Sequence, residues 1–149
     1  YAFNNHKGKA NEICNKYHAY FYPATFNNFA ARMDWAAEGK GNRNPIIVIN
    51  GNEGINPIRI EKKQGNSITL DASQTFDPEN DQLNFKWWVI PEAGTYKGEV
   101  TILNDNSSKT IIDLPIDSAD KTIHIICEVT DCGKPALTSY RRIIITSKN

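Results

Sequence analysis

The chain has no excess charge of either sign and no long apolar run. Its 149 residues contain 17 Lys plus Arg and 17 Asp plus Glu, so the formal net charge is zero. A partner with an anionic surface, such as a nucleic-acid backbone or an acidic membrane, requires a basic surface, and we expect neither partner. Apolar runs such as residues 123–127 and 143–145 are far shorter than the roughly 20 residues of a membrane-spanning helix. We therefore predict a soluble protein.

Cysteines and catalytic motifs are also scarce. The three cysteines, Cys14, Cys127 and Cys132, cannot all pair with one another and do not have the spacing of a metal site. The sequence contains no HExxH, GxSxG, Walker or GxGxxG motif. His124 precedes Glu128 by four residues, but no activated serine or cysteine stands beside it, so we expect a polar surface histidine. We predict no catalytic activity for this chain.

A translation start and a signal peptide are missing from the sequence as well. The chain begins at Tyr1, its one methionine is Met33, and no basic start is followed by an apolar stretch. We expect the chain to be a fragment of a longer protein.

The residues that are present divide the chain near residues 39–45. The first 44 residues contain nine of the 15 aromatic residues but a single branched aliphatic residue, Ile13. The remaining residues contain 27 branched aliphatics. Alanine and aromatic residues favour helix and irregular packing, whereas branched aliphatics at this density favour strands. We expect a helical segment with a linker over residues 1–44 and a β domain over residues 45–149.

Two helices are expected in the first part. Residues 25–37 have an amphipathic pattern, with Thr25 as the N-cap and Gly39 as the C-terminal glycine. The apolar face of this helix consists of Phe26, Phe29, Ala30, Met33 and Ala37. A less regular helix over residues 10–21 is expected to end before Pro23.

The second part has the pattern of an immunoglobulin-like antiparallel β-sandwich, so the fold class is mostly β with a short N-terminal helical extension. The expected strands are residues 46–49, 58–61, 67–71, 83–90, 99–103, 110–114, 122–130 and 139–146. Because side chains alternate along a strand, Trp87 is expected to point inward and Trp88 outward. Cys127 also falls on an inward position, and we expect a small buried hydrophobic residue there.

Three segments resemble one bacterial family. They are FNNFAARMDWA (residues 26–36), DASQTFDPENDQLNFKWWVIPEAGTYKG (residues 71–98) and TIHIICEVTDCGKPALTSYRRIIIT (residues 122–146). DPENDQLNFKW is also similar to a turn and strand of PKD and cadherin-like modules, whereas PEAGTY, YRR and FAARMDW are more specific. Together the segments resemble the C-terminal region of bacterial proteins described as cellulose-binding, which have a nucleoside-hydrolase-like domain followed by an immunoglobulin-like sandwich.

The resemblance implies that residues 1–44 are the tail of an upstream nucleoside-hydrolase-like domain. Nucleoside hydrolases use an N-terminal aspartate cluster, and this stretch contains a single aspartate, Asp34. The resemblance therefore implies a non-catalytic accessory module of a secreted or periplasmic protein, which binds cellulose or another oligosaccharide. In the alternative, the module docks on and supports the upstream domain or mediates self-association, without binding sugar.

An outward face of the sandwich is the candidate carbohydrate site, because an exposed aromatic ring can stack on a sugar while polar neighbours bind its hydroxyls. The candidate residues are Lys86, Trp88, Tyr96, His124, Tyr140 and Arg142. In the alternative, which we favour, the upstream helix covers this face and Trp35 or Phe29 packs on Trp88.

Four acids are a candidate calcium site, since hard cations take carboxylate oxygens. Asp77, Glu79 and Asp81 alternate through a turn, and Asp131 is expected at the same end of the sandwich. The favoured alternative is that these acids bind local backbone amides or water, in which case no cofactor is required.

Overall fold

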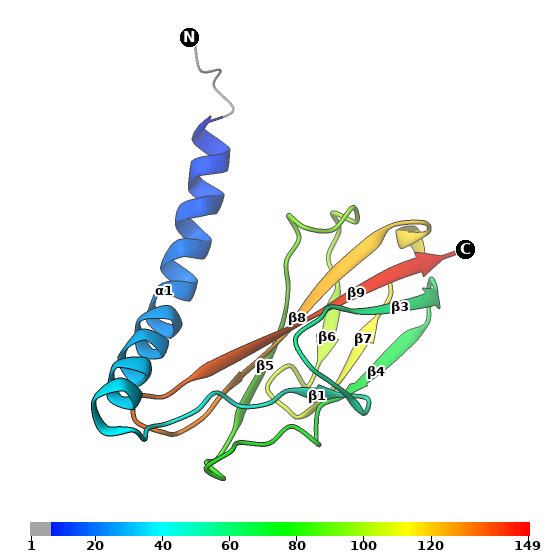
Figure 1. The fold of residues 1–149 in the computed structure, drawn as a ribbon. Helices are drawn as coiled ribbons and strands as arrows, with labels where there is room; N and C mark the ends of the chain where they lie inside the picture. Colours follow the sequence, from blue (N-terminus) through cyan, green and yellow to red (C-terminus); the bar gives the residue numbers. More distant parts are fainter. Residues whose placement is uncertain (1–6) are drawn as a thin grey trace.

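The computed structural model describes residues 7–149, which form one long helix followed by nine short strands (Figure 1). The helix is α1, Lys7–Glu38. The strands are β1 (Val48–Ile49), β2 (Asn52–Glu53), β3 (Ile58–Lys63), β4 (Ser67–Asp71), β5 (Asn84–Val89), β6 (Thr101–Leu103), β7 (Lys109–Asp113), β8 (Thr122–Thr130) and β9 (Thr138–Lys148), with a 3-10 turn, η1 (Ile116–Ser118), before β8. All eight expected strands are present, with ends that differ by a few residues.

Two sheets and a small hairpin make up the β domain. One sheet has the strand order β3–β9–β8–β5, the other has the order β4–β7–β6, and β1 pairs with β2 alone. All pairs are antiparallel except β3 and β9, which run parallel with Ile58 opposite Ile143. The predicted immunoglobulin-like sandwich is confirmed, apart from this one parallel pair.

The core lies between the two sheets and consists mainly of branched aliphatic side chains. Ile68, Leu70 and Ile112 come from the three-stranded sheet, and Ile125 and Ile143 come from the four-stranded sheet. Their burial follows from the alternation of side chains along each strand. The same alternation correctly predicts the most central aromatic residue, because Trp87 is 2% exposed and donates its indole N–H to the Ser107 carbonyl at 2.8 Å.

Cys127 is also inside, with no exposed surface. Burial raises the pKa of its thiol to about 12, with a smaller contribution from the neighbouring Glu128 carboxylate. The expectation of a small buried hydrophobic residue is confirmed, and Cys127 remains a free thiol, as do Cys14 and Cys132.

The expected break at Pro23 is wrong, because α1 continues through it as one helix of 32 residues. A proline inside a helix removes one backbone hydrogen bond, and side chains on both sides of Pro23 hold α1 on the β domain. Phe21 packs on Tyr140 of β9, and Asn27 donates to the Ala136 carbonyl at 2.9 Å. The ribbon bends near its middle, as proline-containing helices do (Figure 1).

Of the two ends predicted for the helix over residues 25–37, the first is wrong and the second is confirmed. Thr25 is not an N-cap, because it lies inside α1 and its hydroxyl donates to the Phe21 carbonyl at 3.0 Å. Gly39 does end the helix: its φ is 68° and its N–H donates to the Trp35 carbonyl at 2.9 Å.

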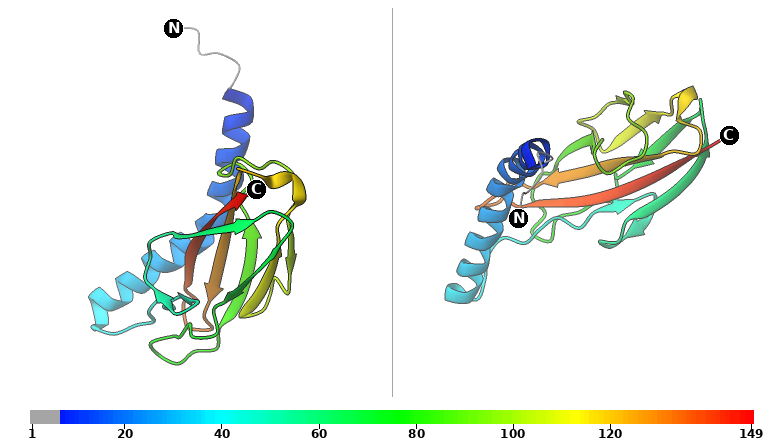
Figure 2. Two further views of the ribbon diagram at one scale, coloured as in Figure 1. Left: turned by 90° about the vertical axis from the view of Figure 1, so that its right-hand side faces the viewer. Right: turned by 90° about the horizontal axis from the view of Figure 1, so that it is seen from above.

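α1 lies on one side of the sandwich, next to the sheet that contains β5, β8 and β9 (Figure 2). It covers the part of that sheet's outer face around Trp88 of β5, Glu128 of β8 and Tyr140 of β9. Within residues 7–149, no helix combines the length and apolar character needed to cross a bilayer.

Candidate functional site

Side chains of α1 and of the four-stranded sheet form an aromatic cluster. It consists of Tyr17, Tyr20 and Phe21 from α1, Trp88 from β5 and Tyr140 from β9. The ring centroids of Tyr20 and Trp88 are 5.2 Å apart, and those of Phe21 and Tyr140 are 5.1 Å apart, both edge to face. Aromatic pairs prefer this geometry, and each pair stabilises by about 0.5–1.5 kcal/mol beyond its buried area.

Glu128 of β8 lies in the middle of the aromatic cluster and binds one residue of the helix and one of the sheet. Its Oε2 accepts the hydroxyl proton of Tyr20 at 2.6 Å and the indole N–H of Trp88 at 3.0 Å. Lys86 donates to the Tyr20 hydroxyl from the other side at 3.1 Å. Burial, followed by the Glu128 carboxylate, raises the pKa of both Tyr20 and Tyr140 above the usual range of a phenol.

The candidate carbohydrate face is therefore covered by α1. Lys86, Trp88 and Tyr140 do come together as predicted, but the helix occupies the space that a sugar ring would need. The favoured alternative is the observed arrangement, although the covering residues are Tyr17, Tyr20 and Phe21 instead of Trp35 or Phe29.

Tyr96 does not belong to this face, and its assignment to the carbohydrate site is wrong. The residue is 7% exposed and is part of the core, where its hydroxyl donates to Asp117 Oδ1 at 2.8 Å. The PEAGTY segment lies outside the regular strands, so the alternation of side chains gave no information about its direction.

His124 and Arg142 lie beside each other on the outer face, but His124 is buried and not the surface residue that we predict. Arg142 donates through Nη2 to His124 Nδ1, an arrangement that requires a neutral imidazole. Burial, and then the positive charge of Arg142, lower the pKa of His124. Since β8 is an inner strand between β5 and β9, its outer-face residues are covered more fully than those of an edge strand.

Three of the four acids of the candidate calcium site, Asp77, Glu79 and Asp131, bind other groups. Asp77 Oδ1 accepts the backbone N–H groups of Glu79 and Asp81 at 2.8 and 3.1 Å. Asp131 Oδ1 accepts those of residues 133 and 137 at 3.0 and 2.8 Å, and Glu79 pairs with Arg43 at 2.6 Å. Within residues 7–149 no three His, Cys, Asp or Glu side chains converge as metal ligands, so these acids do not form the predicted site.

α1 has a second apolar surface, which we call the exposed stripe. It consists of Tyr22, Phe26, Phe29 and Met33, each between 53% and 59% exposed. Their spacing of four, three and four residues places them on one side of the helix, opposite the side that contacts the sheet. Phe26, Phe29 and Met33 are the face expected to be buried, and the structure exposes them instead.

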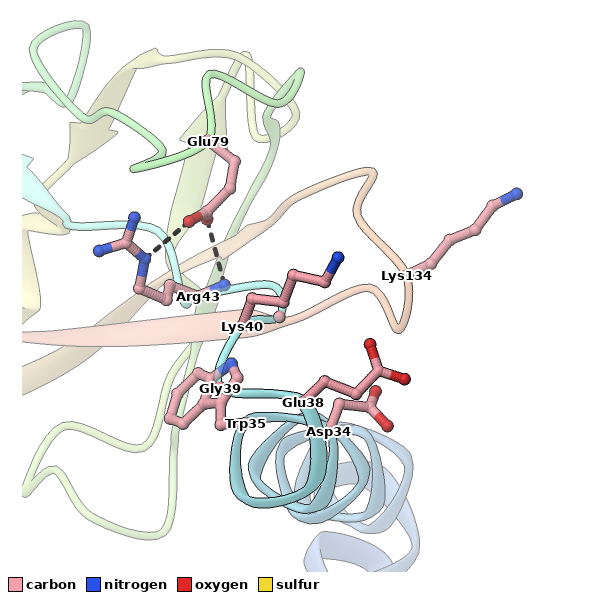
Figure 3. Close-up of a pocket in the computed structure, with 9 residues that line it drawn as sticks. Asp34, Trp35, Glu38, Gly39, Lys40, Arg43, Glu79 and Lys134 are labelled. Carbon is pink, nitrogen blue, oxygen red and sulfur yellow. Dashed lines mark hydrogen bonds and ion pairs between the residues drawn. The ribbon is translucent and has the colours of Figure 1, made fainter.

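A groove of about 820 Å³ lies where α1 meets the sandwich (Figure 3). Trp35 forms one wall, and its indole N–H donates to the Asn42 carbonyl at 2.9 Å. Gly41 permits this packing, because a Cβ there would lie 2.5 Å from Trp35 Cδ1. The charged residues that line the groove are Asp34, Glu38, Lys40, Arg43, Glu79 and Lys134. The feature of the sequence that indicates this groove is Trp35, which comes four residues before the GKGNRNP segment (residues 39–45).

The strands of this sandwich match a known family. The family model described as the C-terminal domain of the cellulose-binding protein Sde0182 matches residues 67–147, which is more than half of the chain and includes β4 to β9. The chain belongs to this family. The resemblance stated from the sequence segments is thus confirmed.

A solved structure with the same architecture is a nucleoside hydrolase-related hypothetical protein from Saccharophagus degradans that is associated with carbohydrate metabolism. It is 35% identical, with a TM-score of 0.85, and the match covers 86% of this chain but 32% of that one. Since residues 45–149 alone supply less than that share of this chain, the match extends into α1. The chain spans about a third of the length of this relative.

Other comparisons add little. The solution structure of the PKD domain from KIAA 1837 protein is 18% identical, has a TM-score of 0.43, and matches over 64% of this chain and 84% of that one. No match to a curated protein was found.

The aromatic cluster predicts different effects for two phenylalanines of α1. Phe21→Ala removes a partly buried ring from the cluster and is expected to lower the free energy of unfolding by about 2 kcal/mol. Phe26→Ala removes an exposed ring and is expected to change it by less than about 0.5 kcal/mol. Urea denaturation followed by tryptophan fluorescence measures both. Equal losses for the two variants would show that the cluster does not hold α1 on the sheet.

Proposed function

We propose that this chain is a non-catalytic C-terminal accessory module that docks on the upstream domain of a longer, nucleoside hydrolase-related protein. The observation that supports this function best is the exposed stripe on α1. Self-association through the same stripe is the less favoured alternative. The related protein is about three times as long as this chain, and two copies of that length would have to fit around the stripe.

α1 is apolar on two opposite sides, which is typical of a helix enclosed between two bodies. Its inner side lies on the sandwich through the aromatic cluster, and its outer side presents the exposed stripe to solvent. Soluble proteins rarely leave contiguous apolar side chains uncovered, and such patches mark interaction surfaces. The stripe begins at Tyr22, whereas the same side of the helix nearer its start is polar, with Asn11 and Asn15. The apolar contact is therefore confined to the half of α1 nearest the sandwich linker.

Most of the related protein from Saccharophagus degradans lies outside the matched region. Because the family model describes a C-terminal domain, we expect the additional chain of this protein to precede the module. A domain joined directly to the start of α1 has a high effective concentration at the stripe, so a modest apolar contact suffices to hold it there. This geometry favours the upstream domain as the occupant.

Carbohydrate binding is the second candidate, and the groove beside Trp35 supports it. An indole wall with carboxylates and amines around it can stack on a pyranose ring and bind its hydroxyls. The family description includes cellulose binding, and the outer face at Trp88 is closed by α1. A sugar ligand of this module is thus better placed in the groove than on the sheet.

The docking proposal predicts the protection of Met33 from oxidation. In the 149-residue chain Met33 is half exposed, and dilute hydrogen peroxide is expected to oxidise it readily. In the full-length protein we expect oxidation about tenfold slower, because the upstream domain covers the stripe. Mass spectrometry of the proteolytic peptide that contains Met33 measures both oxidation rates.

A matched pair of variants controls this experiment in the full-length protein. Phe26→Asp with Phe29→Asp is expected to restore fast oxidation of Met33, since two charges oppose an apolar contact. Asn11→Asp with Asn15→Asp adds the same charge on the same side of α1 and is expected to leave Met33 protected. Equal oxidation rates in the isolated chain and the full-length protein would reject docking through this stripe.

The carbohydrate proposal predicts depletion of the protein by insoluble cellulose. The wild-type chain is expected to bind microcrystalline cellulose. Trp35→Ala is expected to weaken the binding free energy by at least about 1 kcal/mol, whereas Phe26→Ala is expected to bind as the wild type does. If wild-type chain and full-length protein both stay in solution, the module does not bind cellulose; if Trp35→Ala binds unchanged, the groove is not the site.

A further inference from the structure

Arg141 is buried, and within residues 7–149 no carboxylate pairs with it. It lies on β9 opposite Cys127 of β8, faces the inside of the sandwich, and is 2% exposed. Its Nη2 donates to Asn52 Oδ1 of the β1–β2 hairpin at 2.6 Å. The Nε and Nη1 atoms are inaccessible and have no acceptor among the residues that the structure describes.

A buried positive charge is stabilised by a negative partner. No Asp or Glu side chain in the described part of the chain lies within salt-bridge distance of the guanidinium. Burial lowers the pKa of Arg141, but an arginine keeps its proton in proteins. An uncompensated buried charge costs several kcal/mol, and buried polar groups nearly always have a partner. Two donor atoms without an acceptor on such a charge therefore favour an acceptor from outside the described residues.

A pocket of about 340 Å³ lies beside the β1–β2 hairpin, and Arg141 is not among the residues that line it. Pro45, Ile46, Ile47, Ile55 and Tyr140 give it apolar surface, and Asn44 and Ser139 add polar groups. Gly54 connects the two features: it lines the pocket, and a Cβ on Gly54 would lie 3.7 Å from Arg141 Nη1. The hairpin that places Gly54 there is held by two residue pairs, Val48 with Glu53 and Ile49 with Asn52.

We propose that this pocket binds a small organic carboxylate with an apolar body, whose carboxylate pairs with Arg141 when Gly54 and its hairpin move aside. Ligand pockets are mostly apolar with a few placed polar groups, and this pocket matches that description. Arginine pairs with carboxylates through charge-assisted N–H···O bonds, and the apolar body of the ligand would contact the three isoleucines. This site is independent of the exposed stripe and of the groove at Trp35.

Hexanoate is a suitable probe, with hexan-1-ol as the uncharged control of the same length. In NMR titrations of the wild-type 149-residue chain, hexanoate is expected to shift the Arg141 Nε–Hε resonance and the Ile55 methyl resonances with one saturable curve. Hexan-1-ol is expected to leave the Arg141 resonance unchanged. Arg141→Met is expected to weaken hexanoate binding at least about tenfold, which corresponds to about 1.4 kcal/mol.

Arg59→Met is the matched control, because it removes the same charge from an exposed position on β3 and is expected to bind hexanoate as the wild type does. If Arg141→Met does not fold, the two wild-type titrations still decide. A guanidinium served only by internal water would give no hexanoate-dependent shift of Arg141, and that result overturns the proposal. Equal shifts with hexan-1-ol, or equal binding by Arg141→Met, would overturn it as well.

Discussion

The contact between α1 and the outer face of the four-stranded sheet determines how the rest of this molecule is arranged. Tyr20 and Phe21 pack on Trp88 and Tyr140, and Glu128 binds the Tyr20 hydroxyl and the Trp88 indole from beneath. A carboxylate in an aromatic environment is stable there because both of its polar partners are donors. This contact covers the part of the outer face around Trp88 and Tyr140, and it leaves the opposite side of the helix exposed to solvent.

The sequence predicts most of the sandwich, because strands bury alternate residues and turns concentrate Gly, Pro, Asn and Asp. Trp87 inside and Cys127 inside follow from that alternation alone. It does not specify the direction of Tyr96, which lies in an irregular segment, or the burial of His124, which depends on the strands on either side of β8. The parallel pairing of β3 with β9 depends on the path of the chain and has no local signature.

The helix was harder to predict for a physical reason. An apolar pattern at helical spacing predicts that one face of a helix is buried, but it does not show which part of the protein buries that face. Phe26, Phe29 and Met33 have the clearer spacing and are exposed, whereas Tyr20 and Phe21 are the residues that contact the sheet. Pro23 ends an isolated helix but not one held on both sides by tertiary contacts. In the arrangement that we propose, the side of the helix with Phe26, Phe29 and Met33 is the side that the upstream domain covers.

Family membership places this arrangement in a longer protein. In the arrangement that we propose, the exposed stripe holds the neighbouring domain. Neither the groove beside Trp35 nor the pocket beside Gly54 is lined by a residue of this stripe. Docking and ligand binding would then use different surfaces of the same sandwich.

Hydrogen exchange of the α1 amides tests most directly whether the aromatic cluster holds the helix on the sheet. In the 149-residue chain, amides of residues 20–31 are expected to exchange about 100-fold more slowly than in a free peptide of residues 7–38, since opening them requires the cluster to break. Exchange at the rate of the free peptide, while β8 amides remain protected, would contradict this account.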